Sequence, residues 1–347
     1  MLPTSLLPHL AGALTVLATL FASSACTAPD PRPHVIGYMP TWKGLPSTVD
    51  AADLSKLTHI NISFLNPDAS GAFSSDDGPL CMGGATASDI HYLVERAHEA
   101  GVKVLVSLGG GVIPSCSGDW EALLQPEPHQ HLVDHLLQFA ADYDLDGIDV
   151  DLEGVLLTAI DRAGNYTPFI HSLSAGLKPS GKLLTCATAS YEGGMIPIDS
   201  IPCFDFVNIM SYDAIGPSWG EAGTEHSTYE QAEAHIDTWQ RRGLSRDKLV
   251  LGVPFYGYGF GGDYRANYSY GELLETFGPA ATEGDLIGST GADSGYITYN
   301  GPETLRRKTR LALEHGSGVM IWEMSQDAPA PDNLLKVIHD EIAAATR

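Results

Sequence analysis

The sequence predicts an α/β protein folded as one (β/α)8 TIM barrel. From residue 34 onward, short β-branched runs alternate with amphipathic helical segments, which is the pattern of successive strand–helix units. The strand runs are almost continuously apolar, so both faces of the sheet should be buried, as in a parallel sheet covered by helices. Eight such runs favour a closed barrel over an open sheet. No low-complexity linker interrupts the chain, and residues 34–347 are expected to form a single domain.

Each barrel strand is expected where an apolar, β-branched run is bounded by polar or glycine-containing stretches. The eight runs cover residues 34–42, 57–67, 102–110, 145–153, 183–189, 204–213, 249–260 and 318–327. Helical periodicity fills much of the intervening chain, and several helical segments begin at a Ser or Asn and end at a Gly. These segments cover residues 87–101, 129–143, 165–178, 227–243 and 301–316.

The longest stretch without either pattern follows the seventh strand. Residues 261–299 are rich in Gly and Tyr, and we expect an irregular insertion that is too short to form a separate domain. The barrel is therefore expected to lack a large α+β insertion.

The N-terminal residues are expected to direct export and not to join the barrel. Residues 1–26 carry an apolar run that ends in small residues at Cys26, as in a secretory signal peptide, and it is too short for a transmembrane span. The residues before Cys26 are also similar to a bacterial lipobox, although Ser23 stands where such signals usually carry Leu. Lipid attachment at Cys26 and ordinary signal cleavage both stay open, so the protein is expected to be extracellular or lipid-anchored to a bacterial cell envelope. Residues 27–33 then form a short linker.

Four further cysteines follow Cys26, and an even number permits two disulfides in an oxidising compartment. Their order along the chain favours the pairs Cys81–Cys116 and Cys186–Cys203, but the sequence leaves the connectivity open. Neither a Cys-x-x-Cys motif nor a His-rich spacing occurs, so we expect no metal site and no cofactor.

The charge excludes several classes of partner. Asp and Glu number 43 against 19 Lys and Arg, which gives a formal net charge of -24. Nucleic acid and anionic lipid surfaces both attract basic side chains, so neither is an expected partner. Contact with a membrane is expected only through a lipid on Cys26. A neutral substrate suits such a surface, and the protein is expected to be a monomer.

The fourth strand run contains an unusual density of acidic residues. Within "LDGIDVDLEG", period-two alternation places Asp149, Asp151 and Glu153 on one face of the strand and the apolar residues between them on the other. In a barrel these acids face inward near the C-terminal rim, where active sites are built. Helix capping or pairing with Lys explains one or two such residues but not three in phase, and no Lys or Arg occurs between residues 103 and 162. Clustered carboxylates raise at least one pKa, which keeps a proton donor available near neutral pH.

A Mg²⁺ or Ca²⁺ site is the alternative interpretation of these acids. It fits less well, because oxygen-rich cation sites draw ligands from turns and several elements, whereas this cluster lies along one strand. Asp146, at the start of the motif, is expected to be structural.

Three short motifs and one tryptophan in the sequence resemble those of a known family. "DGIDVDLE" matches the Asp-x-x-Asp-x-Asp-x-Glu signature of the glycoside hydrolase family 18 chitinases, and the chain is most similar to single-domain bacterial members. "SLGG" at residues 107–110 looks like the third-strand motif of the family, and "MSYD" at residues 210–213 looks like its sixth-strand motif. Trp322 looks like the eighth-strand tryptophan beneath the sugar. The resemblance covers most of the chain after the signal segment.

The resemblance implies a retaining mechanism in which the substrate participates. Glu153 would protonate the glycosidic oxygen and then activate water, while the 2-acetamido oxygen of the sugar attacks the anomeric carbon to give an oxazolinium ion. Asp151 would orient the acetamido N–H, and Asp149 would share a proton with Asp151. Tyr212 would hydrogen-bond the acetamido carbonyl oxygen. The implied substrate is a polysaccharide or oligosaccharide that contains N-acetylglucosamine.

Further residues are expected to bind the substrate. Trp322 would stack under the sugar, Met210 and Asp213 would line the same subsite, and Tyr38 and Phe64 would line the pocket. For Met210 and Phe64 a role in the core is an equally good interpretation, and the glycines of "SLGG" are expected to serve backbone packing. Additional stacking surfaces are expected among the aromatic residues near strand ends: Trp42, Trp219, Tyr256 and Tyr258.

The chain departs from the common chitinase pattern directly after the acid. Many chitinases continue with an aromatic residue and Pro, whereas this chain has Gly154 and Val155. Together with the short insertion, this predicts an open groove and endo-type cleavage. Two alternatives stay open: an endo-β-N-acetylglucosaminidase acting on N-glycans or peptidoglycan, and a non-catalytic chitinase-like lectin, which retention of Glu153 disfavours.

Overall fold

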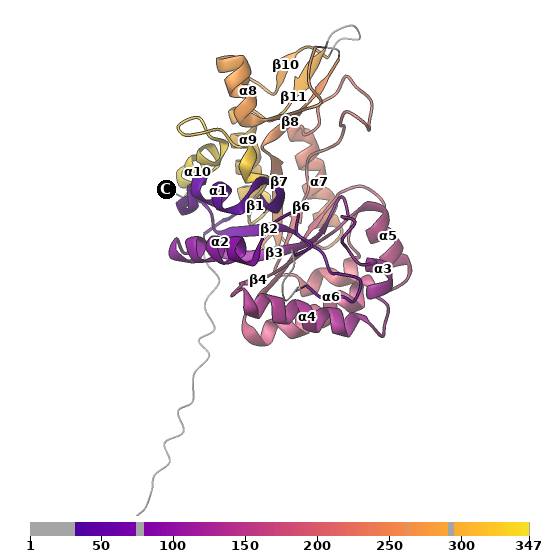
Figure 1. Cartoon of the computed structure of the whole chain (residues 1–347). Coiled ribbons are helices and arrows are strands. Elements are labelled where there is room, and N and C mark those ends of the chain that lie inside the picture. The colour runs from indigo at the N-terminus through magenta and orange to yellow at the C-terminus, as the bar shows by residue number, and fades with distance from the viewer. Residues whose placement is uncertain (1–31, 74–79, 262, 291–294, 347) are drawn as a thin grey trace, which may run out of the picture. The chain divides into compact units, whose positions relative to one another are not determined.

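The computed structural model describes residues 32–73, 80–261, 263–290 and 295–346. Its centre is a closed barrel of parallel strands in the order β1-β12-β7-β6-β5-β4-β3-β2 (Figure 1). The barrel strands are β1 His34–Pro40, β2 His59–Leu65, β3 Lys103–Gly110, β4 Gly147–Leu152, β5 Leu183–Thr188, β6 Phe206–Ile209, β7 Leu249–Pro254 and β12 Gly318–Trp322. This arrangement confirms the predicted (β/α)8 barrel.

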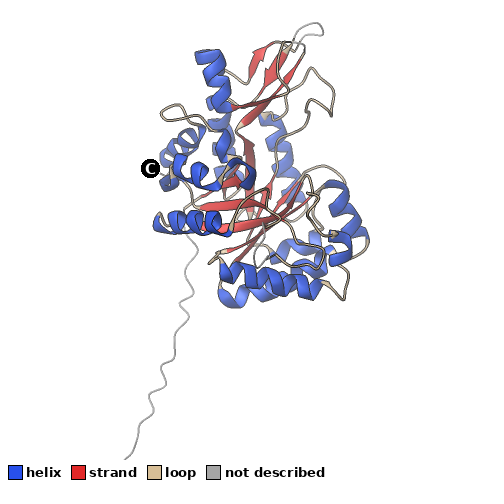
Figure 2. Cartoon of the chain, in the orientation of Figure 1, coloured by secondary structure: helices blue, strands red, loops and turns tan. Residues whose placement is uncertain are grey.

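Helices surround the barrel, and Figure 2 shows them outside the strands. The helices are α1 Leu45–Ala51, α2 Ala87–Glu99, α3 Trp120–Leu123, α4 His129–Asp142, α5 Gly154–Arg162, α6 Tyr166–Leu177, α7 Tyr229–Arg241, α8 Tyr270–Phe277, α9 Pro302–His315 and α10 Leu334–Ala345. The five predicted helical segments correspond to α2, α4, α6, α7 and α9. The start of α2 is defined by a capping box, in which Thr86 and Asp89 satisfy each other's backbone N–H groups.

The two faces of each barrel strand pack into different cores. On β4, Ile148, Val150 and Leu152 join the large apolar core between barrel and helices, as the alternation predicted. Inside the barrel a smaller apolar cluster forms around Tyr38 and Met320. The inward side chains of β4 are Asp149 and Asp151, both almost fully buried. Two carboxyl groups therefore occupy the barrel interior beside this apolar cluster.

The segment after β7 is an ordered α+β insertion, and the prediction of an irregular segment is wrong. The predicted strand 249–260 divides at Phe255 into β7 and a second strand, β8 (Tyr256–Phe260), which leaves the barrel. With β9 (Asn267–Ser269), β10 (Leu286–Gly288) and β11 (Tyr296–Thr298), β8 forms an antiparallel sheet in the order β10-β11-β8-β9. Figure 1 shows this sheet together with α8. Strands of three to five residues separated by turns leave too little periodicity to be recognised in sequence.

One of the two favoured disulfides is present. Cys81 and Cys116 are bonded and link the segments after β2 and β3. The pair Cys186–Cys203 is not formed, and both thiols are free. Cys186 lies on β5 and packs as a fully buried apolar side chain in the core, whereas Cys203 ends a separate 3-10 helix. Proximity along the chain was therefore a poor guide for this pair.

Several predictions concern the N-terminus. Residues 1–31, which include the predicted signal peptide, Cys26 and most of the linker, lie outside the described residues. Within the described part of the chain, no helix is long and apolar enough to cross a bilayer.

Candidate active site

Strand β4 and the residue that follows it bring three acids to the C-terminal end of the barrel. Asp149 and Asp151 point inward from β4, and Glu153 stands at the N-cap of α5. Gly109 of β3 and Gly111, just after that strand, make room for them: a Cβ at Gly109 would lie 2.7 Å from the carbonyl oxygen of Asp151, and a Cβ at Gly111 would lie 3.0 Å from Glu153 Oε1. The acids are thus packed directly against a neighbouring backbone.

Asp149 is held by hydroxyl groups from three other strands. Its Oδ2 accepts hydrogen bonds from Tyr38 Oη and Ser107 Oγ, both at 2.7 Å, and its Oδ1 accepts one from Thr185 Oγ1 at 2.6 Å. Asn208 Nδ2 also donates to Oδ1, at 3.5 Å. Burial raises the pKa of Asp149, and these four donors act against that rise. We refer to Tyr38, Ser107, Thr185 and Asn208 as the Asp149 cage.

Tyr38 was predicted to line the pocket, and its hydroxyl instead supports Asp149. Thr185 and Asn208 were not predicted as site residues, and Ser107 was noted only for its motif. Each occupies an inward position on an otherwise apolar strand, which is the same sequence signal that identified the acids. The register then brings them together, because Asp149 pairs with Ser107 on one side and with Thr185 on the other.

Asp151 has the opposite environment to Asp149. Its Oδ1 is buried and has no hydrogen-bond partner among the described residues. Burial raises its pKa well above the usual value, and the charges of Glu153 and Asp149 raise it further. No described hydrogen bond joins Asp151 to Asp149, whose oxygens are taken up by the cage, so the predicted shared proton has no direct counterpart in this structure. Asp151 Oδ1 therefore has an unused capacity to accept a hydrogen bond within the described structure.

Glu153 has the properties of a proton donor near neutral pH. Burial, and then the charge of Asp213, raise its pKa from 4.5 to about 7. A carboxyl group with such a pKa is protonated in a substantial fraction of molecules at neutral pH and can exchange its proton in both directions. Asp146, in contrast, accepts hydrogen bonds from His98 Nε2 and from the backbone N–H of Val104, as expected for a structural residue.

A cavity of about 630 Å³ opens beside Glu153. Met210, Tyr212 and Asp213 line it together with residues from the segment after β5 and from α7. The backbone of Asp213 is in the left-handed region, with φ 59°, and its Oδ1 accepts a hydrogen bond of 2.5 Å from Tyr256 Oη. The full lining is Glu153, Ala189, Ser190, Tyr191, Met210, Tyr212, Asp213, Ala214, Trp219, Gln231 and His235. The structure thus brings three predicted site residues into one cavity with Glu153.

Aromatic rings form a separate wall on the adjoining strands β1, β2 and β12. Phe64 and Trp322 stack with ring centroids 5.5 Å apart, and Tyr38 meets Trp322 edge-on at 5.5 Å. Trp42, half exposed, extends this wall with its ring 6.1 Å from Phe64. Phe64 and Trp322 are both partly buried. The wall offers flat apolar faces of the kind on which sugar rings stack.

The remaining aromatic predictions divide into two groups. Trp219 is exposed and lines the cavity, and its Nε1 donates to the carbonyl oxygen of Asp213. Tyr256 and Tyr258, on β8, are buried and therefore cannot stack against a sugar, contrary to the prediction. Tyr256 instead orients Asp213, a role that sequence reasoning missed. Tyr191, exposed beside Glu153, was also missed and carries no distinguishing motif.

The glycines of the motifs serve the local packing. Gly110 has φ 93°, and a Cβ there would lie 2.5 Å from the ring of Phe64, so only glycine lets the aromatic wall close against β3. Gly154 also has a positive φ, of 54°, but nothing surrounds its Cβ position, and Val155 beyond it is almost fully exposed. The departure from the family pattern at these two residues therefore lies on an open surface.

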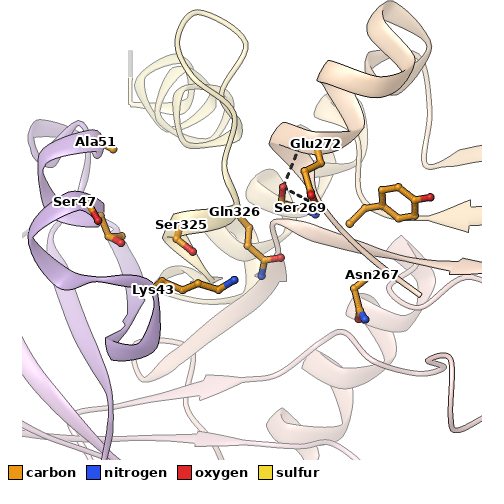
Figure 3. Close-up of a pocket in the computed structure, with 10 residues that line it drawn as sticks. Lys43, Ser47, Ala51, Asn267, Ser269, Glu272, Ser325 and Gln326 are labelled. Atoms are coloured by element: carbon orange, nitrogen blue, oxygen red, sulfur yellow. Dashed lines mark hydrogen bonds between the residues drawn. The ribbon is translucent and has the colours of Figure 1, made fainter. Parts of the chain in front are cut away.

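A second cavity, of about 590 Å³, lies outside the acid cluster. It is bordered by Lys43 after β1, by α1, by Ser325 and Gln326 of the 3-10 helix η6 (Met324–Gln326), and by Asn267 and Glu272 of the insertion (Figure 3). None of its lining residues belongs to the acid cluster. Among the described residues, no group of three or more His, Cys, Asp or Glu side chains is arranged to hold a metal ion.

Known proteins are similar to this chain in sequence and in structure. The sequence model of the family "Glycosyl hydrolases family 18" matches residues 34–327. The chitinase ChiB from the chitin utilization locus of Flavobacterium johnsoniae is similar in structure, with a TM-score of 0.77, 31% identity, and coverage of 90% of this chain and 95% of that chain. A chitinase from Bacteroides thetaiotaomicron has a TM-score of 0.76 and 26% identity, with coverage of 90% and 96%.

Named sequence relatives include both enzymes and proteins described only as similar to enzymes. A chitinase-like effector of Moniliophthora roreri is 27% identical across 74% of this chain. Chitinase A1 of Niallia circulans is 24% identical across 90% of this chain. The matches span 65% and 59% of these two proteins, so this chain corresponds to less than two thirds of each.

Proposed function

This chain belongs to glycosyl hydrolase family 18, and we propose that it is a glycosidase that cleaves β-1,4-linked N-acetylglucosamine polymers, chitin and its oligosaccharides above all. One observation carries the proposal. Glu153, whose pKa is raised to about 7, stands beside Asp151, whose buried Oδ1 has no hydrogen-bond partner in the part of the chain that the structure describes. A proton donor is thus adjacent to a carboxyl group whose Oδ1 can accept a hydrogen bond from the substrate.

The proposed first step is protonation of the glycosidic oxygen by Glu153, and such proton transfers contribute about 10²–10⁴-fold to rate. The 2-acetamido oxygen of the substrate then displaces the leaving group and forms an oxazolinium ion. An intramolecular nucleophile held in line can reach effective molarities of roughly 10⁵–10⁸ M. In the second step Glu153, now ionised, takes a proton from the water that opens the oxazolinium ring, which restores the β-configuration.

Asp151 and the Asp149 cage would control the attacking acetamido group. The N–H of that group would donate a hydrogen bond to the unpartnered Oδ1 of Asp151, and the ionised form of Asp151 would stabilise the positive charge of the oxazolinium ion. Asp149 is fixed by its four hydrogen bonds and serves as a rigid charge beneath Asp151. Tyr212 lines the cavity close to these acids, and its hydroxyl would bind the acetamido carbonyl oxygen. Trp322 would support the sugar from the aromatic wall.

The choice of chitin is supported by the relatives, because both similar solved structures are described as chitinases. An endo-acting enzyme is supported by exposed aromatic rings in two places, namely Trp42 in the aromatic wall, and Tyr191 and Trp219 in the cavity beside Glu153. The alternative is a sugar-binding protein without catalytic activity, because one relative is described only as a chitinase-like effector. The presence of Asp149, Asp151 and Glu153, together with the raised pKa of Glu153, favours catalysis.

The proposal is tested with Glu153→Gln and a matched control, Glu192→Gln, which changes an exposed carboxylate on the neighbouring loop. Both variants and the unmodified protein are incubated with chito-oligosaccharides, peptidoglycan and a high-mannose glycopeptide, and product masses are measured. We expect hydrolysis of the chito-oligosaccharides, its loss in Glu153→Gln with sugar binding retained, and an initial β-anomer by NMR. Substantial residual turnover in Glu153→Gln, or an initial α-anomer, would refute the mechanism.

Export to the cell surface or the medium belongs to the same proposal, because chitin is an insoluble extracellular polymer. Mass spectrometry of the protein isolated from a bacterial envelope tests it. A diacylglyceryl mass on Cys26 supports an anchored form, cleavage without lipid supports a released form, and an intact N-terminus contradicts export.

A further inference from the structure

A fully buried histidine lies next to Asp213. His226 belongs to the segment between β6 and α7, and its Nδ1 is 3.6 Å from Asp213 Oδ1. This separation is within the range of an ion pair but longer than a hydrogen bond, and neither ring nitrogen of His226 has a hydrogen-bond partner among the described residues. Buried polar atoms without partners cost free energy, so the burial of this imidazole beside a carboxyl group points to a function.

The insertion and the chain after Asp213 together determine where His226 lies. The backbone N–H of His226 donates to Thr298 Oγ1 on β11 at 3.2 Å, and its carbonyl oxygen accepts from the backbone N–H of the residue after Asp213 at 3.0 Å. Its ring packs against the rings of Tyr256 and Tyr258 on β8, with centroids 5.3 and 5.2 Å away. The imidazole is therefore held between β8, β11 and the residue that follows Asp213.

Four groups that can carry charge act on His226, and they decide its protonation. They are Asp213, the hydroxyls of Tyr256 and Tyr258, and Lys308 of α9. Burial lowers the pKa of His226 and the charge of Lys308 acts in the same direction, whereas Asp213 opposes both, so the ring is neutral near pH 7. Burial raises the pKa of both tyrosines, which therefore stay protonated. Asp213 is the anion among these groups, and the single N–H of a neutral imidazole is best placed on Nδ1, toward Asp213.

Asp213 needs such support because its side chain is partly exposed. It lines the cavity beside Glu153, and 37% of its side-chain surface is exposed. The charge of Asp213 contributes to the raised pKa of Glu153, and a Coulomb interaction weakens with distance and with solvation. A carboxylate that turned toward water would therefore lose part of its effect on Glu153. Tyr256 Oη provides one restraint through its hydrogen bond to Asp213 Oδ1.

We infer that His226 is a positioning residue, whose Nδ1–H provides the second restraint and keeps the Asp213 carboxylate in the cavity that it shares with Glu153. Both restraints act on the same oxygen, Oδ1, so Tyr256 and His226 hold Asp213 from the side of the insertion. The inference rests on the proposed function only where it concerns the rate of hydrolysis, because the restraint itself exists without substrate. It assigns to the reaction a residue that acts through Asp213 alone.

Substitutions with opposite structural defects separate a role of the N–H from a role in packing. His226→Phe keeps a ring of similar size and removes the N–H, and His226→Met removes it in a different shape. His226→Asn leaves part of the space empty but places an amide N–H close to the position of Nδ1. Asp213→Asn and the double variant Asp213→Asn/His226→Phe test whether His226 acts through Asp213. Glu221→Gln, which removes an exposed charge from the same segment, is the matched control.

Two readouts follow Glu153, and one of them needs no substrate. The titration midpoint of the Glu153 carboxyl group is measured by ¹³C NMR, with the resonance assigned through Glu153→Gln. The alkaline decline of kcat/KM on chitotetraose gives the same midpoint in the working protein. The melting temperature of each variant records the effect on packing.

We expect both midpoints to fall by about 0.5 pH units in His226→Phe and His226→Met, as for a unit charge that moves roughly 2 Å further away at the effective dielectric of a protein site. They should fall further in Asp213→Asn, and no further than that in the double variant. His226→Asn and Glu221→Gln should keep the midpoint of the unmodified protein, although His226→Asn should melt at a lower temperature.

An unmoved midpoint in both variants that lack the N–H would overturn the inference, and so would a shift of equal size in His226→Asn or an additional shift in the double variant. In each of these cases hydrolysis by the unmodified protein would still support the proposed function. If the NMR midpoints move as expected but the unmodified protein hydrolyses no chito-oligosaccharide, the proposed function fails and the restraint on Asp213 stands.

Discussion

Replacing Glu153 with glutamine should stabilise the protein at pH 8 and leave its stability unchanged at pH 4. The reason is the pKa of Glu153, which burial and Asp213 raise from 4.5 to about 7. Between these values the native protein holds a proton that the unfolded chain releases, so unfolding becomes easier as the pH rises through this window. The full penalty is about 3 kcal/mol and is present above pH 7. Glutamine carries no charge and avoids the penalty. The charge of Glu153 also raises the pKa of Asp151, so the substitution relieves both residues in the same direction.

Urea unfolding at pH 4, 6 and 8, followed by circular dichroism with the disulfide intact, measures this difference. The free energies of unfolding of Glu153→Gln and the unmodified protein should coincide at the lowest pH and diverge as the pH rises. Glu192→Gln, which alters an exposed carboxylate nearby, should show no such divergence. A constant difference between Glu153→Gln and the unmodified protein at all three pH values would refute the reasoning, and so would a less stable variant at pH 8. This measurement needs no substrate and is independent of the proposed activity.

Three further outcomes are expected. Hydrolysis should decline above about pH 7, because Glu153 must carry a proton to act. Asp213→Asn should move this decline to lower pH, because it removes a charge that raises the pKa of Glu153. A pH profile of kcat/KM whose alkaline decline stays at the same pH in the variant would contradict this. Thr185→Val removes a donor to buried Asp149 and should cost about 1–3 kcal/mol of unfolding free energy in urea titrations; unchanged stability would show that the cage does not stabilise the fold. Cys81→Ser removes the disulfide and should lower the free energy of unfolding by about 2–4 kcal/mol, measured by thermal unfolding under oxidising conditions. A variant as stable as the unmodified protein would contradict this.

The barrel was predictable because its signals are local. The strands are runs rich in apolar residues, and the alternation on β4 alone assigned Ile148 to the core and Asp149 to the barrel interior. The donors to Asp149 could not be assigned in the same way, because Tyr38, Ser107 and Thr185 lie on three other strands and meet it only through the register of the closed sheet. A search for polar residues at inward positions would have narrowed the candidates but not paired them.

The error after β7 has a physical cause, which is that sequence patterns do not show where a chain changes direction. Residues 249–260 read as one strand, yet the chain turns at Phe255, and the tyrosines beyond it face Asp213 and the insertion and not a sugar. The α7 residues Gln231 and His235 gave no signal either, because a polar residue on an amphipathic helix is normally solvent-facing.

The insertion between β7 and α9 limits how far this protein can be shortened. It enters through β8 and leaves through β11, which are antiparallel neighbours, so a designer could join the two ends with a short loop and obtain a bare barrel. That truncation would remove the Tyr256 hydroxyl from Asp213 and the ring of Tyr258 from its contact with Trp219. The insertion therefore supports two residues that line the cavity beside Glu153, and loop exchange is better directed to the outer strands β9 and β10 than to β8.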